Sequence, residues 1–270
     1  MSYSRSGRGF SKPPSGSQID WGHPLSQNLV SALLCSEGAG PLSDLARISR
    51  VSSTTIPVWS SQSKGRVARD WAFPTAGSEG LTFQKLMGWT AATFVRVTGT
   101  ITGQNFIPVR FSNYVSESNN QGWFFQLSGS NPRKWDAGSF NNNGFANYSI
   151  VGTTTVVEGE WFIVQTSDRT TRRLFVNGIQ DASGTTNPIP AVNTAGTYNN
   201  TTLTAGINAW TYAVYCWDRC LNPLEITRLY TEPYAMIRHV THRRYFVEAA
   251  AADVYSGRGV GRGLSRGVYR

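Results

Sequence analysis

The sequence predicts an all-β protein, a sandwich of two antiparallel sheets with one short helix near the end of its body. Residues 19–235 are a series of short segments that alternate apolar and polar residues, separated by Gly, Asn, Ser, Thr and Pro, which is typical of strands joined by turns. The hydrophobic fraction is 40%, with 9 Trp, 11 Tyr and 13 Phe among 270 residues, so the body can bury a core.

Two segments in the middle of the body, 121–128 and 161–167, alternate as strands that line a core. Their core-facing side chains are predicted to be Trp123, Phe125 and Leu127 in the first segment and Phe162 and Val164 in the second.

The next two predicted elements are a hairpin and a buried strand. Asn177-Gly178 predicts a two-residue hairpin, because both central residues of the favoured turn have positive φ. The segment 210–217 is apolar at nearly every position. We therefore expect it to be buried on both faces, or to have an outer face that the terminal segments or a partner cover.

The one predicted helix begins after Asn222. This residue is a suitable N-cap, Pro223 suits the first turn, and Glu225 can reach back to the cap. The apolar side of the helix, which we expect to close one end of the sandwich, consists of Ile226, Leu229 and Tyr230.

Positive charge is concentrated in two extended arms, an N-terminal arm (1–18) and a C-terminal arm (236–270). The net charge is +9, of which the first arm carries +3 and the second +5, so the body is nearly neutral. Both arms are rich in Gly or Ser, which predicts that they become ordered only along a partner. The cations expected to bind that partner are Arg5, Arg8, Lys12, Arg243, Arg244, Arg258, Arg262, Arg266 and Arg270.

Three motifs carry a family resemblance. The first begins Asp20-Trp-Gly-His-Pro-Leu and ends at Asp44-Leu45, the second combines Trp161-Phe-Ile-Val with Arg173-Leu-Phe-Val-Asn-Gly, and the third runs from Val214 to Ile226. In this order they resemble concanavalin A-like, laminin-G-like domains of phage-encoded proteins. The resemblance covers residues 19 to about 250 and implies a jelly-roll sandwich that is associated with a virion.

No catalytic residues are predicted. Glycosidases of the laminarinase type in this superfamily carry Glu-x-Asp-x-x-Glu on one strand, and that motif is absent. The acidic pair Glu158 and Glu160 is expected to lie in a solvated loop, and His23 is expected to be a turn or packing residue rather than a general base.

Neither a cofactor nor a metal is expected. His239 and His242 lie among arginines, and the Asn-rich loops and Asp136 fit turns better than a calcium site. The three cysteines are expected to be reduced thiols, and neither a signal peptide nor a membrane-spanning helix is predicted.

The resemblance and the arms together predict a non-enzymatic virion structural protein of a phage, a capsid decoration or head-fibre-like protein anchored by its arms. The expected partners are the major capsid protein or other virion proteins, and a homo-oligomer such as a trimer is expected. The protein would assemble in the host cytoplasm and lie on the capsid surface, without a membrane partner. Nucleic-acid binding through the arms is the less favoured use of their charge.

The alternative left open is a carbohydrate-binding, lectin-like protein of a tail or fibre that adsorbs the particle to a host glycan. Aromatic rings near Asn-rich loops can stack on sugar faces. The side chains expected to face a glycan are Trp123, Trp135, Tyr148, Tyr198 and Trp210.

Overall fold

The computed structural model describes thirteen segments of the chain. They are residues 12–14, 16–39, 42–46, 58–62, 65–69, 88–99, 106–114, 120–128, 132–140, 148–168, 170–185, 197–201 and 208–238.

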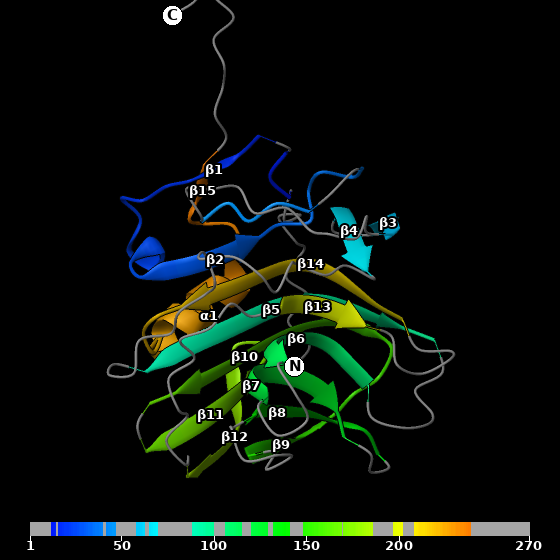
Figure 1. Ribbon diagram of the computed structural model, residues 1–270, viewed down its shortest axis with the longest axis vertical. Coiled ribbons are helices and arrows are strands. Elements are labelled where there is room, and N and C mark those ends of the chain that lie inside the picture. Colours follow the sequence, from blue (N-terminus) through cyan, green and yellow to red (C-terminus); the bar gives the residue numbers. More distant parts are fainter. Residues whose placement is uncertain are drawn as a thin grey trace, which may run out of the picture. The chain divides into compact units, whose positions relative to one another are not determined.

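The described strands form two large antiparallel sheets, which confirms the predicted all-β class (Figure 1). The eight-stranded sheet has the order β12 (Ile179–Thr185), β11 (Thr171–Val176), β10 (Gly159–Ser167), β5 (Trp89–Thr98), β14 (Asn208–Trp217), β4 (Gly65–Arg69) and β3 (Val58–Gln62), and β2 (Leu29–Leu33) also pairs with β14. The five-stranded sheet has the order β13 (Thr197–Thr201), β6 (Phe106–Tyr114), β7 (Asn120–Leu127), β8 (Lys134–Phe140) and β9 (Tyr148–Thr155).

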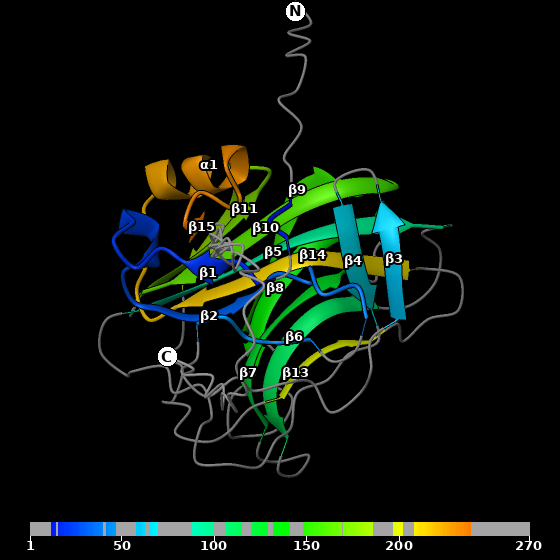
Figure 2. The ribbon, with the colours of Figure 1, turned by 90° about the horizontal axis from the view of Figure 1, so that it is seen from above.

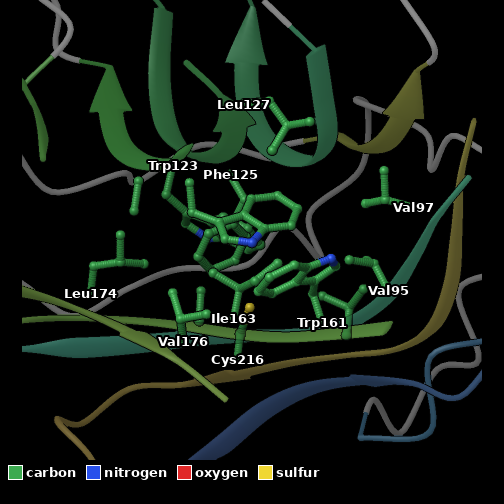
Figure 3. Packing of buried hydrophobic residues seen from close by; sticks show 14 of the residues in the cluster. Val95, Val97, Trp123, Phe125, Leu127, Trp161, Ile163, Leu174, Val176 and Cys216 are labelled. Carbon is green, nitrogen blue, oxygen red and sulfur yellow. The ribbon is translucent and has the colours of Figure 1, made fainter. Parts of the chain in front are cut away.

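The main core lies between the two sheets. Figure 3 shows Trp123 and Phe125 of the five-stranded sheet pointing toward Ile163 of the eight-stranded sheet. Trp135 packs edge-on against Trp161, with ring centroids 6.1 Å apart. Trp123, Phe125 and Leu127 therefore line the core as their alternation predicts.

A second apolar layer covers the opposite face of the eight-stranded sheet. Phe162 and Val164 line this layer, whereas Trp161 and Ile163 on the same strand face the main core. The segment 161–167 thus lines two cores instead of the one that its alternation predicts.

The second layer is made by the helix α1 (Pro223–Thr231), the 3-10 helix η1 (Pro24–Ser26) and the short ladder of β1 (Gln18–Ile19) with β15 (Ile237–Arg238). Figure 2 shows α1 on one side of the eight-stranded sheet and β6, β7 and β13 on the other. The expectation that the helix closes one end of the sandwich is therefore wrong. Its apolar side lies against the outward-facing side chains of β10, where Tyr230 stacks on Phe162 at 5.8 Å.

The helix start and the hairpin are confirmed. The side chain of Asn222 accepts a hydrogen bond from the backbone N–H of Glu225, and the side chain of Glu225 accepts one from the N–H of Asn222, which completes a capping box. Asn177 and Gly178 have φ values of 52° and 83°, as the two-residue turn between β11 and β12 requires. No helix among the described residues is long and apolar enough to cross a membrane.

The strand β14 runs through the centre of the eight-stranded sheet, and its segment 211–217 is buried on both faces, as predicted. Val214 and Cys216 face the main core, and Tyr215 and Trp217 face the second layer. The indole N–H of Trp217 donates to the carbonyl oxygen of Leu25 at 2.6 Å, which fixes η1 on the sheet.

The helix α1 provides a stability test with a matched control. Leu229 is fully buried in the second layer, whereas Leu224 on the same helix is 81% exposed. Leu229→Ala should lower the free energy of unfolding in urea by about 2–5 kcal/mol, because it leaves a cavity. Leu224→Ala should change that free energy by less than about 0.5 kcal/mol. Equal effects of the two substitutions would contradict the placement of α1.

Candidate functional site

The acidic pair Glu158 and Glu160 does not form a joint site. Glu158 is exposed in the turn before β10, whereas Glu160 accepts a hydrogen bond of 2.8 Å from the hydroxyl of the fully buried Tyr212. The expectation of a solvated loop is therefore wrong for Glu160, which is held against the outward-facing side of the eight-stranded sheet.

His23 is a turn residue, as predicted, and it caps the 3-10 helix η1. Its Nδ1 accepts a hydrogen bond from the backbone N–H of Leu25 at the start of η1. Burial and the charge of Arg228 lower the pKa of His23. His239 and His242 lie outside the described residues.

Two of the five aromatic residues expected to face a glycan are in the core instead. Trp123 is 1% exposed and Trp135 is fully buried, because both lie on the face of the five-stranded sheet that meets the main core. Trp210 is half-buried beside the second layer. Tyr148 and Tyr198 belong to β9 and β13, and their side chains are outside the described part of the chain.

The opposite face of the five-stranded sheet holds a polar pair. Gln126 and Asp136 are paired across β7 and β8, on the face that alternation turns away from the main core. The Nε2 of Gln126 donates to Oδ2 of Asp136 at 2.6 Å. Next to this pair, the ring of Phe124 lies over Gly138, where a Cβ would come within 2.2 Å of the ring. A glycine is thus needed at position 138.

Asp136 is a buried carboxylate on this face, at 5% exposure. Burial raises its pKa, against the hydrogen bonds of Gln126 and Ser149 and the charge of Arg172, which favour the carboxylate. Among the described residues, its Oδ1 has no hydrogen-bond partner. A buried carboxyl with a raised pKa is typical of functional sites. Alternation along β8 predicts that Asp136 and Trp135 lie on opposite faces of the strand. It does not predict which of these faces meets the core.

Other described carboxylates hold loops and strands together. Asp44 accepts hydrogen bonds from the backbone N–H of Ala32 and of Ala46, at 2.9 and 3.0 Å. Asp181 of β12 accepts a hydrogen bond from the hydroxyl of each of Thr153 and Thr154 of β9, both at 2.7 Å, and so joins the edges of the two large sheets. These groups are structural.

Of the cations predicted to bind a partner, the structure describes Lys12. Its Nζ donates to the carbonyl oxygen of Cys35 at 2.7 Å and lies 5.8 Å from the ring centroid of Tyr212. These contacts hold the ammonium group of Lys12 against the body, and its contact with a partner stays a prediction. The predicted arm cations outside the described residues are Arg5, Arg8, Arg243, Arg244, Arg258, Arg262, Arg266 and Arg270.

The described body also extends into the predicted C-terminal arm. Met236 is fully buried in the second layer, and Ile237–Arg238 form β15. None of the three cysteines forms a disulfide, and Cys35 and Cys216 are buried. Within the described segments, no group of three His, Cys, Asp or Glu residues could hold a metal ion.

A family model matches more than half of the chain. It is described as the concanavalin A-like lectin/glucanases superfamily, and the match covers residues 75–227. No curated protein matches the chain in sequence.

Solved structures share the fold at low sequence identity. The binding domain of Paraclostridial mosquitocidal protein 1 superimposes with a TM-score of 0.61 at 14% identity, over 77% of this chain and 53% of that one. The binding domain of botulinum neurotoxin serotype G gives 0.57 at 14%, over 77% and 52%. A Trypanosoma rangeli sialidase gives 0.55 at 14%, over 78% and 33%. The chain thus spans about half the length of the toxin binding domains.

Asp136 and Asp181 should give opposite pH dependences of stability. Because the folded-state pKa of Asp136 is raised above its ordinary value of 3.8, the carboxyl costs stability as pH rises from that value through the folded pKa. Asp136→Asn should therefore gain stability relative to wild type as pH rises above about 4. The measurement is the free energy of unfolding in urea.

Asp181→Asn is the matched control. Burial raises the pKa of Asp181, but hydrogen bonds from Thr154 and Thr153 outweigh burial and lower it. Asp181 therefore stabilises the fold above pH 3.8, and this contribution is lost as pH falls through its folded pKa. The variant should lose stability relative to wild type above pH 4 and lose less below it. The same pH trend for both variants would contradict the assignment.

Proposed function

This chain belongs to the concanavalin A-like lectin/glucanase superfamily, and we propose that it is a non-enzymatic carbohydrate-binding protein whose glycan site is the outer face of its five-stranded sheet. The observation that carries the proposal is the Gln126–Asp136 pair on that face. Along β5, β10 and β14, neither face of the eight-stranded sheet is open to a ligand. One face meets the main core, and the second apolar layer covers the other.

The outer face of the five-stranded sheet presents groups that suit a sugar. Asp136 fixes the amide of Gln126, which is half-buried and leaves its Oε1 as an acceptor for a hydroxyl. On the adjacent strand β9, Val151 lies opposite Asp136 and Ser149 lies opposite Gly138, and both are exposed. An amide, a hydroxyl and an apolar side chain can together bind the hydroxyls and the C–H groups of a sugar.

The structural neighbours give this proposal further support. One is described as the binding domain of botulinum neurotoxin DC in complex with SialylT, and another title states that cell entry of botulinum neurotoxin type C depends on two ganglioside molecules. A binding role also agrees with the positions of Glu158 and Glu160, which do not form a pair of catalytic carboxylates. Glu160 accepts a hydrogen bond from the hydroxyl of Tyr212, whereas Glu158 is exposed in the turn.

Glycan-array binding of the full chain tests the proposal. We expect at least one glycan to bind, without being hydrolysed. Gln126→Ala should weaken binding about tenfold, which is the effect of losing one well-placed hydrogen bond at a buried site. Gln180→Ala is the matched control, because Gln180 is an exposed glutamine on β12 of the other sheet. Binding that Gln126→Ala leaves unchanged, or an array with no bound glycan, would refute the proposal.

The second candidate function is a virion structural protein of a phage, a capsid decoration or head-fibre-like protein that its arms anchor. The observation in its favour is the ladder of β1 with β15, which pairs Gln18 with Arg238. Residues of both predicted arms therefore meet at one place on the body. The partners would be the major capsid protein or other virion proteins, on the capsid surface.

Co-sedimentation with purified capsids tests the second candidate. The full chain should sediment with the particles, and removal of residues 239–270 should abolish sedimentation while the near-UV circular dichroism of the body is retained. The glycan-binding variant Gln126→Ala serves as the control and should sediment like wild type. If the shortened chain stays on the capsid, the arm is not the anchor.

A further inference from the structure

The chain enters and leaves the body side by side. Gln18 pairs with Arg238 and Ile19 with Ile237 in an antiparallel register, and the backbone N–H of Asp20 donates to the carbonyl oxygen of Met236 at 2.8 Å. Ile19 and Met236 are buried in the second layer. The ladder is thus fixed to the core and does not depend on its few backbone hydrogen bonds alone.

Lys12 binds the body close to the same place. It contacts Cys35 and Tyr212. Burial raises the pKa of the Tyr234 phenol, and Cys35 and Tyr212 are close enough to raise it further. The backbone carbonyl oxygen of Tyr234 accepts a hydrogen bond from the N–H of Ile237, the first residue of β15. Lys12 and β15 therefore both lie beside the second layer, because Lys12 contacts its buried Tyr212 while Tyr234 and Ile237 pack against it.

Two basic segments continue from this neighbourhood. The N-terminal extension, residues 1–11, contains two arginines and no acid, and the C-terminal extension, residues 239–270, contains six arginines against Glu248 and Asp253. Their charges are +2 and +4, so together they hold +6 of the net +9. Both extensions therefore continue from segments that the ladder of β1 with β15 brings side by side.

We propose that the two extensions bind one acidic protein surface together, as a two-point anchor whose strength depends on their shared origin. This proposal rests on the second candidate function and specifies its partner as a surface rich in Asp and Glu. Arginine binds carboxylates through two parallel hydrogen bonds, and the interleaved Val260, Leu264 and Tyr269 suit a protein surface better than a phosphate backbone.

The physical basis is effective concentration. Once one extension is bound, the other is held near the same surface, and binding becomes tighter than with either extension alone. The gain depends on the length of chain between the two binding segments. Lengthening that connection lowers the effective concentration roughly as the −3/2 power of its length.

The test measures binding of the full chain to poly-L-glutamate by titration calorimetry at fixed ionic strength. Neutralising either extension, by Arg5→Gln with Arg8→Gln or by Arg→Gln at positions 258, 262, 266 and 270, should weaken binding about tenfold or more. Inserting about forty Gly and Ser residues between Arg238 and His239 should weaken it about fourfold by the −3/2 power. This insertion changes no residue of the body, so a folding defect cannot explain the loss.

The same insertion placed after Arg270 is the matched control and should leave the affinity unchanged. Equal affinity with the insertion at either position would overturn the two-point anchor, and so would unchanged binding after neutralisation of the N-terminal extension. Tighter binding to a single-stranded oligonucleotide of equal length than to polyglutamate would overturn the acidic protein surface as the partner. If polyglutamate binding behaves as expected while capsids do not bind, only the virion role fails.

Discussion

The need to cover both faces of the central strands governs this structure. β5, β10 and β14 are apolar on both sides, so the sheet that they form cannot leave either side in water without a large hydrophobic cost. The five-stranded sheet covers one side. The other side is covered by elements far apart in the sequence, among which the hydrogen bond from Trp217 to Leu25 spans 192 residues. The N-terminal segment, η1 and α1 are where they are because this second face requires them.

Local features of the fold could be predicted from the sequence, and the direction of each face could not. The turn at Asn177-Gly178 and the capping box of Asn222 and Glu225 depend on residues within four positions of one another, and the structure has both. Alternation correctly predicts that Trp123 and Phe125 lie on one face of the strand. It does not predict which of the two faces meets the other sheet. Trp123 and Trp135 could therefore be assigned to a glycan surface, although they form the core. The side of the sheet that α1 covers likewise depends on contacts between residues that are far apart in the sequence.

The candidate site was hidden from the sequence for a related reason. Asp136 stands between Trp135 and Ala137 without any motif around it, and its partner Gln126 is on a neighbouring strand. Its difference from Asp181 appears only in three dimensions, since both are buried to some degree but Asp181 has hydrogen bonds enough to remain charged. The role of a carboxylate in this chain is set by the number of donors that the fold brings to it. The superfamily supplies the scaffold, and these local donor sets determine what each acid can do on it.

The pairing of Gln18 with Arg238 also affects how the body can be rearranged along a chain. A domain whose first and last strands are neighbours can be placed within a surface loop of a host protein, because the loop needs to open only by the width of one strand pair. The same closeness permits circular permutation: a short linker could join residues 18 and 238, and new ends could be opened in the exposed turn at Val157 and Glu158. Such a permuted chain would retain every strand pairing of the two large sheets. The body is therefore a unit that recombination can move into other proteins without changing its interior.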